Sequence, residues 1–110
     1  MVLDYPNLFP EHGCRKLNLV FDQRAQRFMR AAGEVLDRTI AAAAAQAHVH
    51  FVDVRHEFAH HELCARQEWV DFFVSPKAKR PGAVTGSFHP NAAGQRAYAR
   101  VLRAALEHIL

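Results

Sequence analysis

The residues that most favour a catalytic role surround His89, in the segment Gly-Ser-Phe-His-Pro-Asn-Ala-Ala-Gly over positions 86–94. Pro90 follows the histidine directly, and apolar residues then recur at helical spacing up to Leu110. Proline near the first helical position presets the helical backbone, so it would fix the imidazole at a loop–helix junction. A histidine held there, near the C-terminal edge of a parallel sheet, can act as a general base in ester hydrolysis.

A second pattern, HEFAH, places His56, Glu57 and His60 at the HExxH spacing of zinc peptidases. On a helix this spacing puts two imidazoles on one face, with the glutamate as general base. Glu62 and Glu68 are available as a third ligand, but neither lies in a third-ligand motif, and the segment has no helical stripe. We therefore assign no metal and no other cofactor, and we keep a zinc metallopeptidase as the alternative.

The two cysteines, Cys14 and Cys64, lie too far apart for a CxxC redox or zinc pattern. Two interpretations remain open at this point. The cysteines are either buried thiols in a reducing compartment or a single disulfide that closes a loop of about fifty residues.

The elements that must position these residues follow an α/β order. Strand–helix–strand predicts a parallel pair with the helix as crossover. Two parallel strands are too few for a sheet that is covered on both faces, so the chain reads as the last part of an α/β domain. Residues 75–86, rich in proline and glycine, are predicted as loop. The expected elements are a strand over 2–5, a helix with a buried apolar stripe over 22–48, a strand over 49–54 and a helix from 90 or 91 to 110.

Composition excludes several classes of protein. The 110 residues carry a net charge of +3, and their arginines are scattered without interleaved aromatic residues, so we expect no nucleic-acid binding. No apolar run approaches the roughly 20 residues of a membrane span, so no transmembrane segment is predicted. The first residues show no signal peptide.

Taken together, five blocks resemble the C-terminal part of the SGNH (GDSL-type) hydrolases, in particular the secreted actinobacterial esterase and lipase branch. The resemblance implies a flavodoxin-like three-layer α/β/α domain with a parallel sheet. Residues 1–110 would form the C-terminal segment of that single domain, without the N-terminal part that bears the nucleophile. The blocks are DYPNLFP from position 4, Cys14, FVDV from position 51, HELC from position 61 and SFHPNAAGQ from position 87, with Phe58 as a further matching residue.

The same resemblance assigns roles to residues near the last block. His89 matches the general base of the family, and Gly86 stands where many members have the aspartate of DxxH. The backbone carbonyl of Gly86 would then orient His89, as a carbonyl does in some members. No GDS or GxND block is present, and neither Ser75 nor Ser87 fits the nucleophile block. We therefore expect an ester hydrolase segment that is inactive as this chain alone.

The resemblance also implies a Cys14–Cys64 disulfide and a secreted or cell-envelope protein. Its substrate would be a small-molecule or lipid ester. An incomplete sheet leaves apolar faces open, so we expect the chain either to self-associate or to need the missing N-terminal half. A non-catalytic α/β binding module is the remaining alternative.

Overall fold

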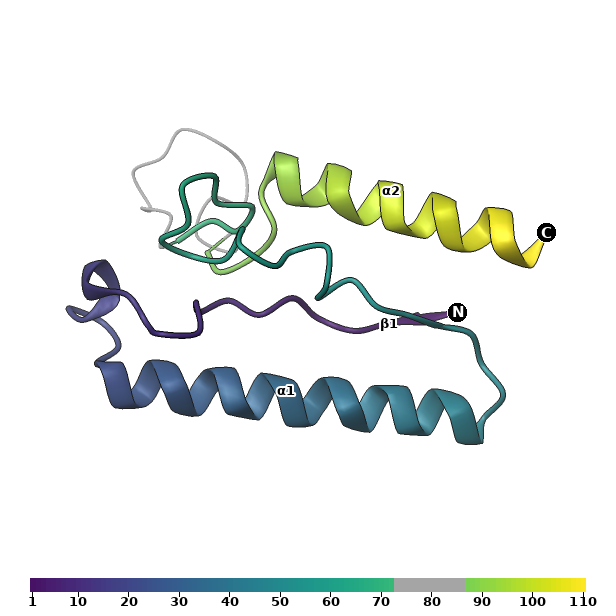
Figure 1. Cartoon of the computed structure of the whole chain (residues 1–110), viewed down its shortest axis with the longest axis horizontal. Helices are drawn as coiled ribbons and strands as arrows, with labels where there is room; N and C mark the ends of the chain where they lie inside the picture. The colour runs from purple at the N-terminus through teal and green to yellow at the C-terminus, as the bar shows by residue number, and fades with distance from the viewer. Residues whose placement is uncertain (73–86) are drawn as a thin grey trace.

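The computed structural model describes residues 1–72 and 87–110, and Figure 1 shows their arrangement. The elements confirm the predicted α/β order. They are, along the chain, strand β1 (Val2–Leu3), a short 3-10 helix (Arg15–Leu17), helix α1 (Gln23–Gln46), strand β2 (Phe51–Val52) and helix α2 (Ala92–Ile109). The predicted loop over 75–86 lies outside the described residues.

The two strands pair in parallel, with Val2 opposite Phe51 and Leu3 opposite Val52, as predicted. Both strands are shorter than expected because their ends bind other partners. After β2, the backbone N–H of Val54 donates to the side-chain Oδ1 of Asp4 at 2.6 Å instead of to a backbone carbonyl of the ladder. At the start of β2, the N–H of Val49 closes the end of α1 by donating to the carbonyl of Ala44 at 2.9 Å.

Helix α1 connects the strands and begins at the predicted cap. The Asp22 carboxylate accepts a hydrogen bond of 2.8 Å from the N–H of Ala25, which satisfies a free amide of the first turn. The helix ends two residues earlier than predicted because His48 adopts a left-handed backbone, with φ of 54°. Such a residue cannot continue a right-handed helix.

The predicted buried stripe of α1 is wrong for this chain. Phe28 is 73% exposed, and Val35 and Leu36 are each 54% exposed. Spacing shows which residues share a helix face, but it does not show whether anything covers that face. The described sheet has only two strands, so much of the apolar side of α1 has no partner among the described residues.

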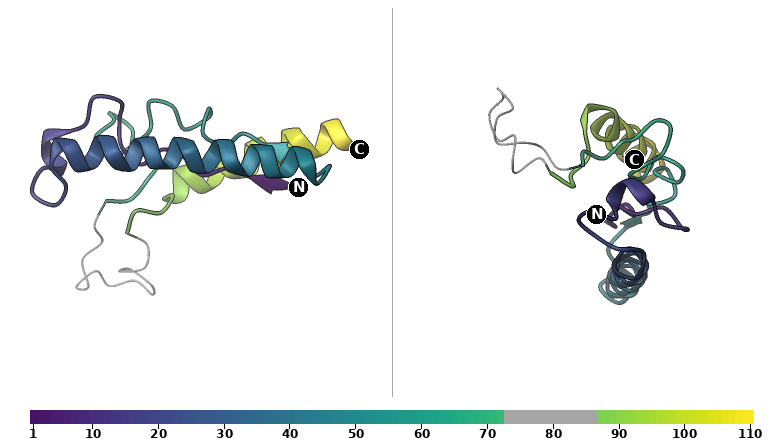
Figure 2. Two further views of the ribbon diagram at one scale, coloured as in Figure 1. Left: turned by 90° about the horizontal axis from the view of Figure 1, so that it is seen from below. Right: turned by 90° about the vertical axis from the view of Figure 1, so that its left-hand side faces the viewer.

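The two helices lie on opposite sides of the strands, which gives the three layers predicted for the fold (Figures 1 and 2). Helix α2 begins at Ala92 after the cap Asn91, and the apolar stripe predicted for it is half-buried or buried apart from Ile109. No described helix is long and apolar enough to cross a membrane. The main core is formed by β2, the start of α2 and the segments around them, and comprises Phe9, Leu17, Val52, Val54, Phe58, Leu63, Val70 and Ala97.

Candidate functional site

His89 lies on a short segment that is hydrogen-bonded to residues 69–71. The N–H of Phe88 donates to the carbonyl of Asp71 at 2.8 Å, and the N–H of Asp71 donates to the carbonyl of His89 at 2.9 Å. Val70 and Pro90 form an antiparallel bridge between them. The backbone is therefore held by hydrogen bonds both before and after His89.

Asn91 joins this segment to the start of α2. Its side-chain oxygen caps the helix by accepting from the N–H groups of Ala93 at 3.0 Å and Gly94 at 3.1 Å. Its amide nitrogen donates to the carbonyl of Glu68 at 2.8 Å. The prediction that Pro90 forms the first turn is wrong, because proline stands before the cap and pairs with Val70. Asn91 is the residue that places the junction.

Gly94, the last glycine of the most specific block, allows a close approach of backbones. A Cβ at this position would collide with the carbonyl oxygen of Trp69 and would lie 2.9 Å from the Cβ of Pro90. Only glycine lets α2 pack so tightly on the segment that holds His89. The sequence block contains Gly94, but only the structure shows why the position requires glycine.

Trp69, whose carbonyl oxygen approaches Gly94, is itself held by packing of its indole ring. The imidazole of His61 stacks flat on the indole, with ring centroids 3.6 Å apart and planes 2° apart. Phe58 packs edge-on against the indole at 5.3 Å, and the guanidinium of Arg100 lies 5.5 Å from its centroid. His61, the first residue of the HELC block, therefore helps to position the His89 segment indirectly, by packing against Trp69.

The predicted disulfide between Cys14 and Cys64 is confirmed, with Cα atoms 6.3 Å apart. This separation lies within the range that a disulfide spans without strain. One residue before Cys64, the N–H of Leu63 donates to the carbonyl of Leu8 at 3.0 Å. The disulfide and this hydrogen bond fasten the loop after β1 to the loop after β2.

His89 is exposed. Its Nδ1 lies 3.2 Å from the hydroxyl oxygen of Tyr5, which comes from the C-terminal end of β1. The preceding residue, Phe88, has φ of 62°, a left-handed conformation that costs a non-glycine residue about 1–2 kcal/mol. The rings of Phe21 and Phe72 hold Phe88 edge-on, with centroids at 5.9 and 5.8 Å.

The remaining predicted candidates do not join His89. Gly86, whose carbonyl was expected to orient the imidazole, lies outside the described residues. Asp53, in the FVDV block, accepts a hydrogen bond of 2.9 Å from the N–H of His56 and so caps the turn after β2. Glu57, the glutamate of HExxH, instead binds Arg100 at 3.0 Å.

The HExxH segment lacks the helix that a zinc peptidase needs. Residues 55–60 form consecutive turns, and His60 has a left-handed φ of 69°. The two imidazoles are therefore not presented by successive turns of one helix. Among the described residues, no group of three or more histidine, cysteine, aspartate or glutamate side chains could hold a metal ion.

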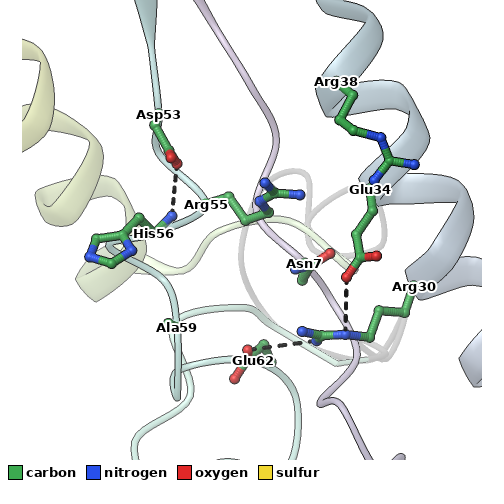
Figure 3. A pocket seen from close by; sticks show the side chains of 9 residues that line it. All are labelled: Asn7, Arg30, Glu34, Arg38, Asp53, Arg55, His56, Ala59 and Glu62. Carbon is green, nitrogen blue, oxygen red and sulfur yellow. Dashed lines mark hydrogen bonds and ion pairs between the residues drawn. The ribbon is translucent and has the colours of Figure 1, made fainter. Parts of the chain in front are cut away.

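Beyond the strand ends, charged residues line a polar cavity of about 360 Å³, shown in Figure 3. Its arginines are largely balanced: Arg30 lies 3.6 Å from Glu34 and 3.9 Å from Glu62. Arg55 lies 3.5 Å from the buried Asp37. His89 does not line this cavity, so the cavity does not complete the site.

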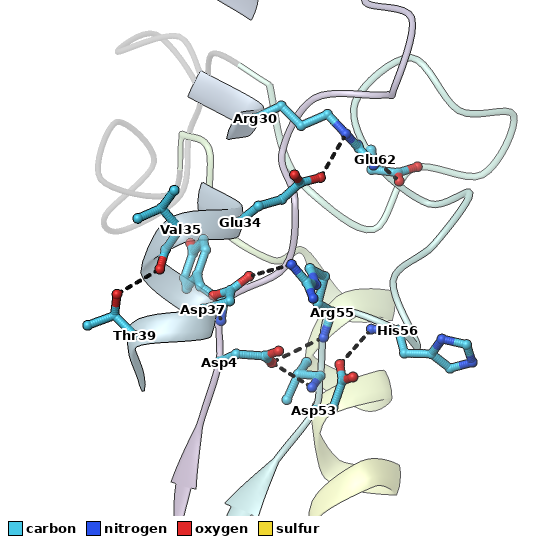
Figure 4. Close-up of polar contacts among 12 residues, drawn as sticks. Asp4, Arg30, Glu34, Val35, Asp37, Thr39, Asp53, Arg55, His56 and Glu62 are labelled. Atoms are coloured by element: carbon cyan, nitrogen blue, oxygen red, sulfur yellow. Dashed lines mark hydrogen bonds and ion pairs between the residues drawn. The ribbon is translucent and has the colours of Figure 1, made fainter. Parts of the chain in front are cut away.

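Asp4, a residue that sequence reasoning did not single out, holds the two strand ends together (Figure 4). Its Oδ1 accepts from the N–H groups of Val54 at 2.6 Å and Arg55 at 3.2 Å. Burial raises the pKa of this carboxyl above 3.8, and the two backbone donors partly oppose that rise. Asp4 opens the DYPNLFP block, but the block assigned it no role, and a strand-end carboxylate alone does not predict such a clamp.

The chain is similar in sequence and structure to lipases from Streptomyces. No family model matches the chain. A lipase from Streptomyces rimosus is 31% identical over 106 residues, which cover 96% of this chain and 36% of the lipase. The crystal structure of the extracellular lipase from Streptomyces rimosus has a TM-score of 0.78 and 31% identity, over 94% of this chain and 41% of that chain.

Phospholipase A1 from Streptomyces albidoflavus NA297 gives a TM-score of 0.77 and 27% identity with the same coverage. The chain thus spans about two fifths of the solved lipases and little more than a third of the curated relative. The α/β arrangement with its parallel strand pair and two helices agrees with these comparisons. The relatives and the α/β fold confirm the predicted resemblance to the SGNH lipases, over less than half the length of each.

Proposed function

We propose that this chain supplies the general-base histidine, His89, of an SGNH-type hydrolase that cleaves carboxylic esters of lipids or small molecules. The observation that carries the proposal is an exposed imidazole on a backbone fixed by residues 69–71, in a chain similar to lipases. The extracellular lipase among its relatives and the Cys14–Cys64 disulfide also support a secreted protein.

In this reaction His89 removes the proton from a serine hydroxyl as that oxygen attacks the ester carbonyl. The resulting imidazolium then gives the proton to the alkoxide that leaves, and water repeats the sequence on the acyl-enzyme. The chain has two serines, Ser75 and Ser87, and neither lies in a nucleophile block. The nucleophile and the oxyanion-hole donors must therefore come from the N-terminal part of an SGNH domain.

We also propose that residues 1–110 are one segment of a single domain, and that the N-terminal part packs against the exposed side of α1 and extends the two-stranded sheet. Each strand has one edge that pairs with no other described strand. A groove of about 100 Å³ between α1 and the residues after β1 is lined by apolar side chains, among them Phe9, Met29 and Leu36. Both features are typical of surfaces that a further layer covers.

The experiment joins the N-terminal part of a related SGNH lipase upstream of this chain and measures hydrolysis of a short-chain p-nitrophenyl ester. We expect turnover by the joined protein and only background hydrolysis by the 110-residue chain. His89→Ala should lower kcat of the joined protein by about 10²–10⁴-fold, the usual contribution of a general base.

His108→Ala, an exposed histidine in the last turn of α2, is the matched control and should leave kcat unchanged. Robust turnover by the 110-residue chain, or full activity of the joined protein with His89→Ala, would contradict the proposal.

A further inference from the structure

The backbone of Tyr5 is fixed by contacts that do not involve His89. Its N–H donates to Asp37 Oδ1 on α1 at 3.2 Å, and Pro6 restricts its backbone to extended conformations. Burial raises the pKa of the phenol above 10.0, so its oxygen keeps its proton throughout the neutral range. The hydroxyl is therefore a neutral group, fixed by its own backbone, beside the imidazole.

This hydroxyl contacts two groups of the His89 segment. Its oxygen lies 3.2 Å from Nδ1 of His89 and 3.4 Å from the carbonyl oxygen of Phe88. The phenol has one proton to donate and can also accept. Among the described residues, Tyr5 is the donor that lies beside the Phe88 carbonyl, so a proton donated there gives both groups a protein partner.

We propose that Tyr5 is a positioning residue that holds His89 in the Nδ1–H tautomer, by accepting a hydrogen bond from Nδ1–H while donating its own proton to the Phe88 carbonyl. The inference rests on the proposed role of His89 as general base. It assigns to a tyrosine from the end of β1 the orienting role that a triad carboxylate has, without the charge.

The chemical consequence concerns the other ring nitrogen. With the proton on Nδ1, the lone pair of Nε2 is free to take the proton of a serine hydroxyl. When Nε2 becomes protonated, the Nδ1–H···O bond to Tyr5 persists, so no hydrogen bond rearranges during the proton transfer. Groups that need no reorganisation during reaction are the ones that lower a barrier most effectively.

The opposite arrangement would not support a base. If Tyr5 donated to Nδ1, the imidazole proton would reside on Nε2, and that nitrogen could not accept a proton from serine. The Phe88 carbonyl would also lose its donor, and Phe88 already has a left-handed backbone. The structure thus favours one direction of the hydrogen-bond chain, from His89 through Tyr5 to Phe88.

The test is the tautomer of His89, measured by long-range ¹H–¹⁵N NMR of the 110-residue chain at a pH where its imidazoles are neutral. The His89 signals are identified by their loss in His89→Ala. We expect Nδ1–H in the unmodified chain, and a shift in Tyr5→Phe to the Nε2–H form that free imidazole side chains prefer. Tyr98→Phe removes the other tyrosine hydroxyl and should leave the tautomer unchanged.

Nε2–H in the unmodified chain would overturn the proposal. So would an unchanged Nδ1–H form in Tyr5→Phe, which would leave the orienting role to the Gly86 carbonyl. This readout needs no activity, so it stands apart from the proposed function.

In the protein joined to the N-terminal part of a related SGNH lipase, Tyr5→Phe should lower kcat about fivefold to tenfold with KM unchanged, as expected for one neutral hydrogen bond. A structural defect would instead alter KM and stability together. Unchanged kcat in Tyr5→Phe would exclude the positioning role. A joined protein that is inactive even with Tyr5 would refute the proposed function, while the tautomer result would stand.

Discussion

Gly94 determines how closely α2 approaches the segment that carries His89. The chain provides an internal comparison, because Gly33 is also a helical glycine, on α1. A Cβ at Gly33 would have Asn7 Oδ1 as its nearest neighbour at an ordinary 3.7 Å, whereas one at Gly94 would collide with backbone. The same substitution should therefore have opposite effects at the two positions.

We expect Gly94→Ala to lower the free energy of unfolding by about 1–3 kcal/mol, the usual range for an overpacked site. Gly33→Ala should raise it by up to about 1 kcal/mol, because alanine favours a helix interior over glycine. Urea unfolding followed by circular dichroism measures both. Equal effects of the two variants would show that the contact with Trp69 is not tight.

At the scale of elements, the strands are too short to hold the site by themselves, and the loops after them do most of the positioning. The Cys14–Cys64 disulfide fastens one loop to the other, and the second loop supports Trp69 through the stacked ring of His61. The separation of 50 residues between the cysteines makes the enclosed loop long, so its closure restricts the unfolded chain strongly.

Replacing both cysteines by serine should lower the free energy of unfolding by about 4 kcal/mol on the chain-entropy model of disulfide stabilisation. The measurement is urea unfolding of the oxidised chain, with and without reductant. The double variant serves as its own control, since reductant should destabilise the original chain and leave the variant unaffected. A chain whose stability does not change on reduction would contradict this account.

At the scale of the whole molecule, one side of α1 carries apolar residues that no described element covers. Phe28, Val35 and Leu36 are all more than half exposed. Exposed patches of this kind mark surfaces that bind another protein segment. In the isolated chain, a second copy is the available occupant.

We expect the 110-residue chain to self-associate at high micromolar concentration. The pair of changes Phe28→Gln and Val35→Gln should reduce this association without loss of helix content, because both side chains are exposed. Sedimentation velocity gives the oligomeric state, and Arg27→Gln on the same helix is the polar control. The prediction would be wrong if the chain stays monomeric, or if the Phe28 and Val35 changes leave its association unaltered.

Much of the fold could be predicted from the sequence. Hydrophobic spacing and caps gave both helices to within about two residues at each end, and the strand–helix–strand order predicted the parallel pair. These features depend on local backbone preference and on chain order. The burial of α1 could not be predicted, because burial depends on neighbours that spacing does not specify.

For the site, the sequence by itself determined that His89 stands just before a helix and that no nucleophile block accompanies it. Only the tertiary structure decided that Asn91 places the junction, that Gly94 must lack a Cβ and that Tyr5 meets the imidazole. The Tyr5–His89 contact joins residues 84 positions apart. A contact between such distant residues is set by how β1, β2 and α2 pack together, and local preferences along the chain do not encode it.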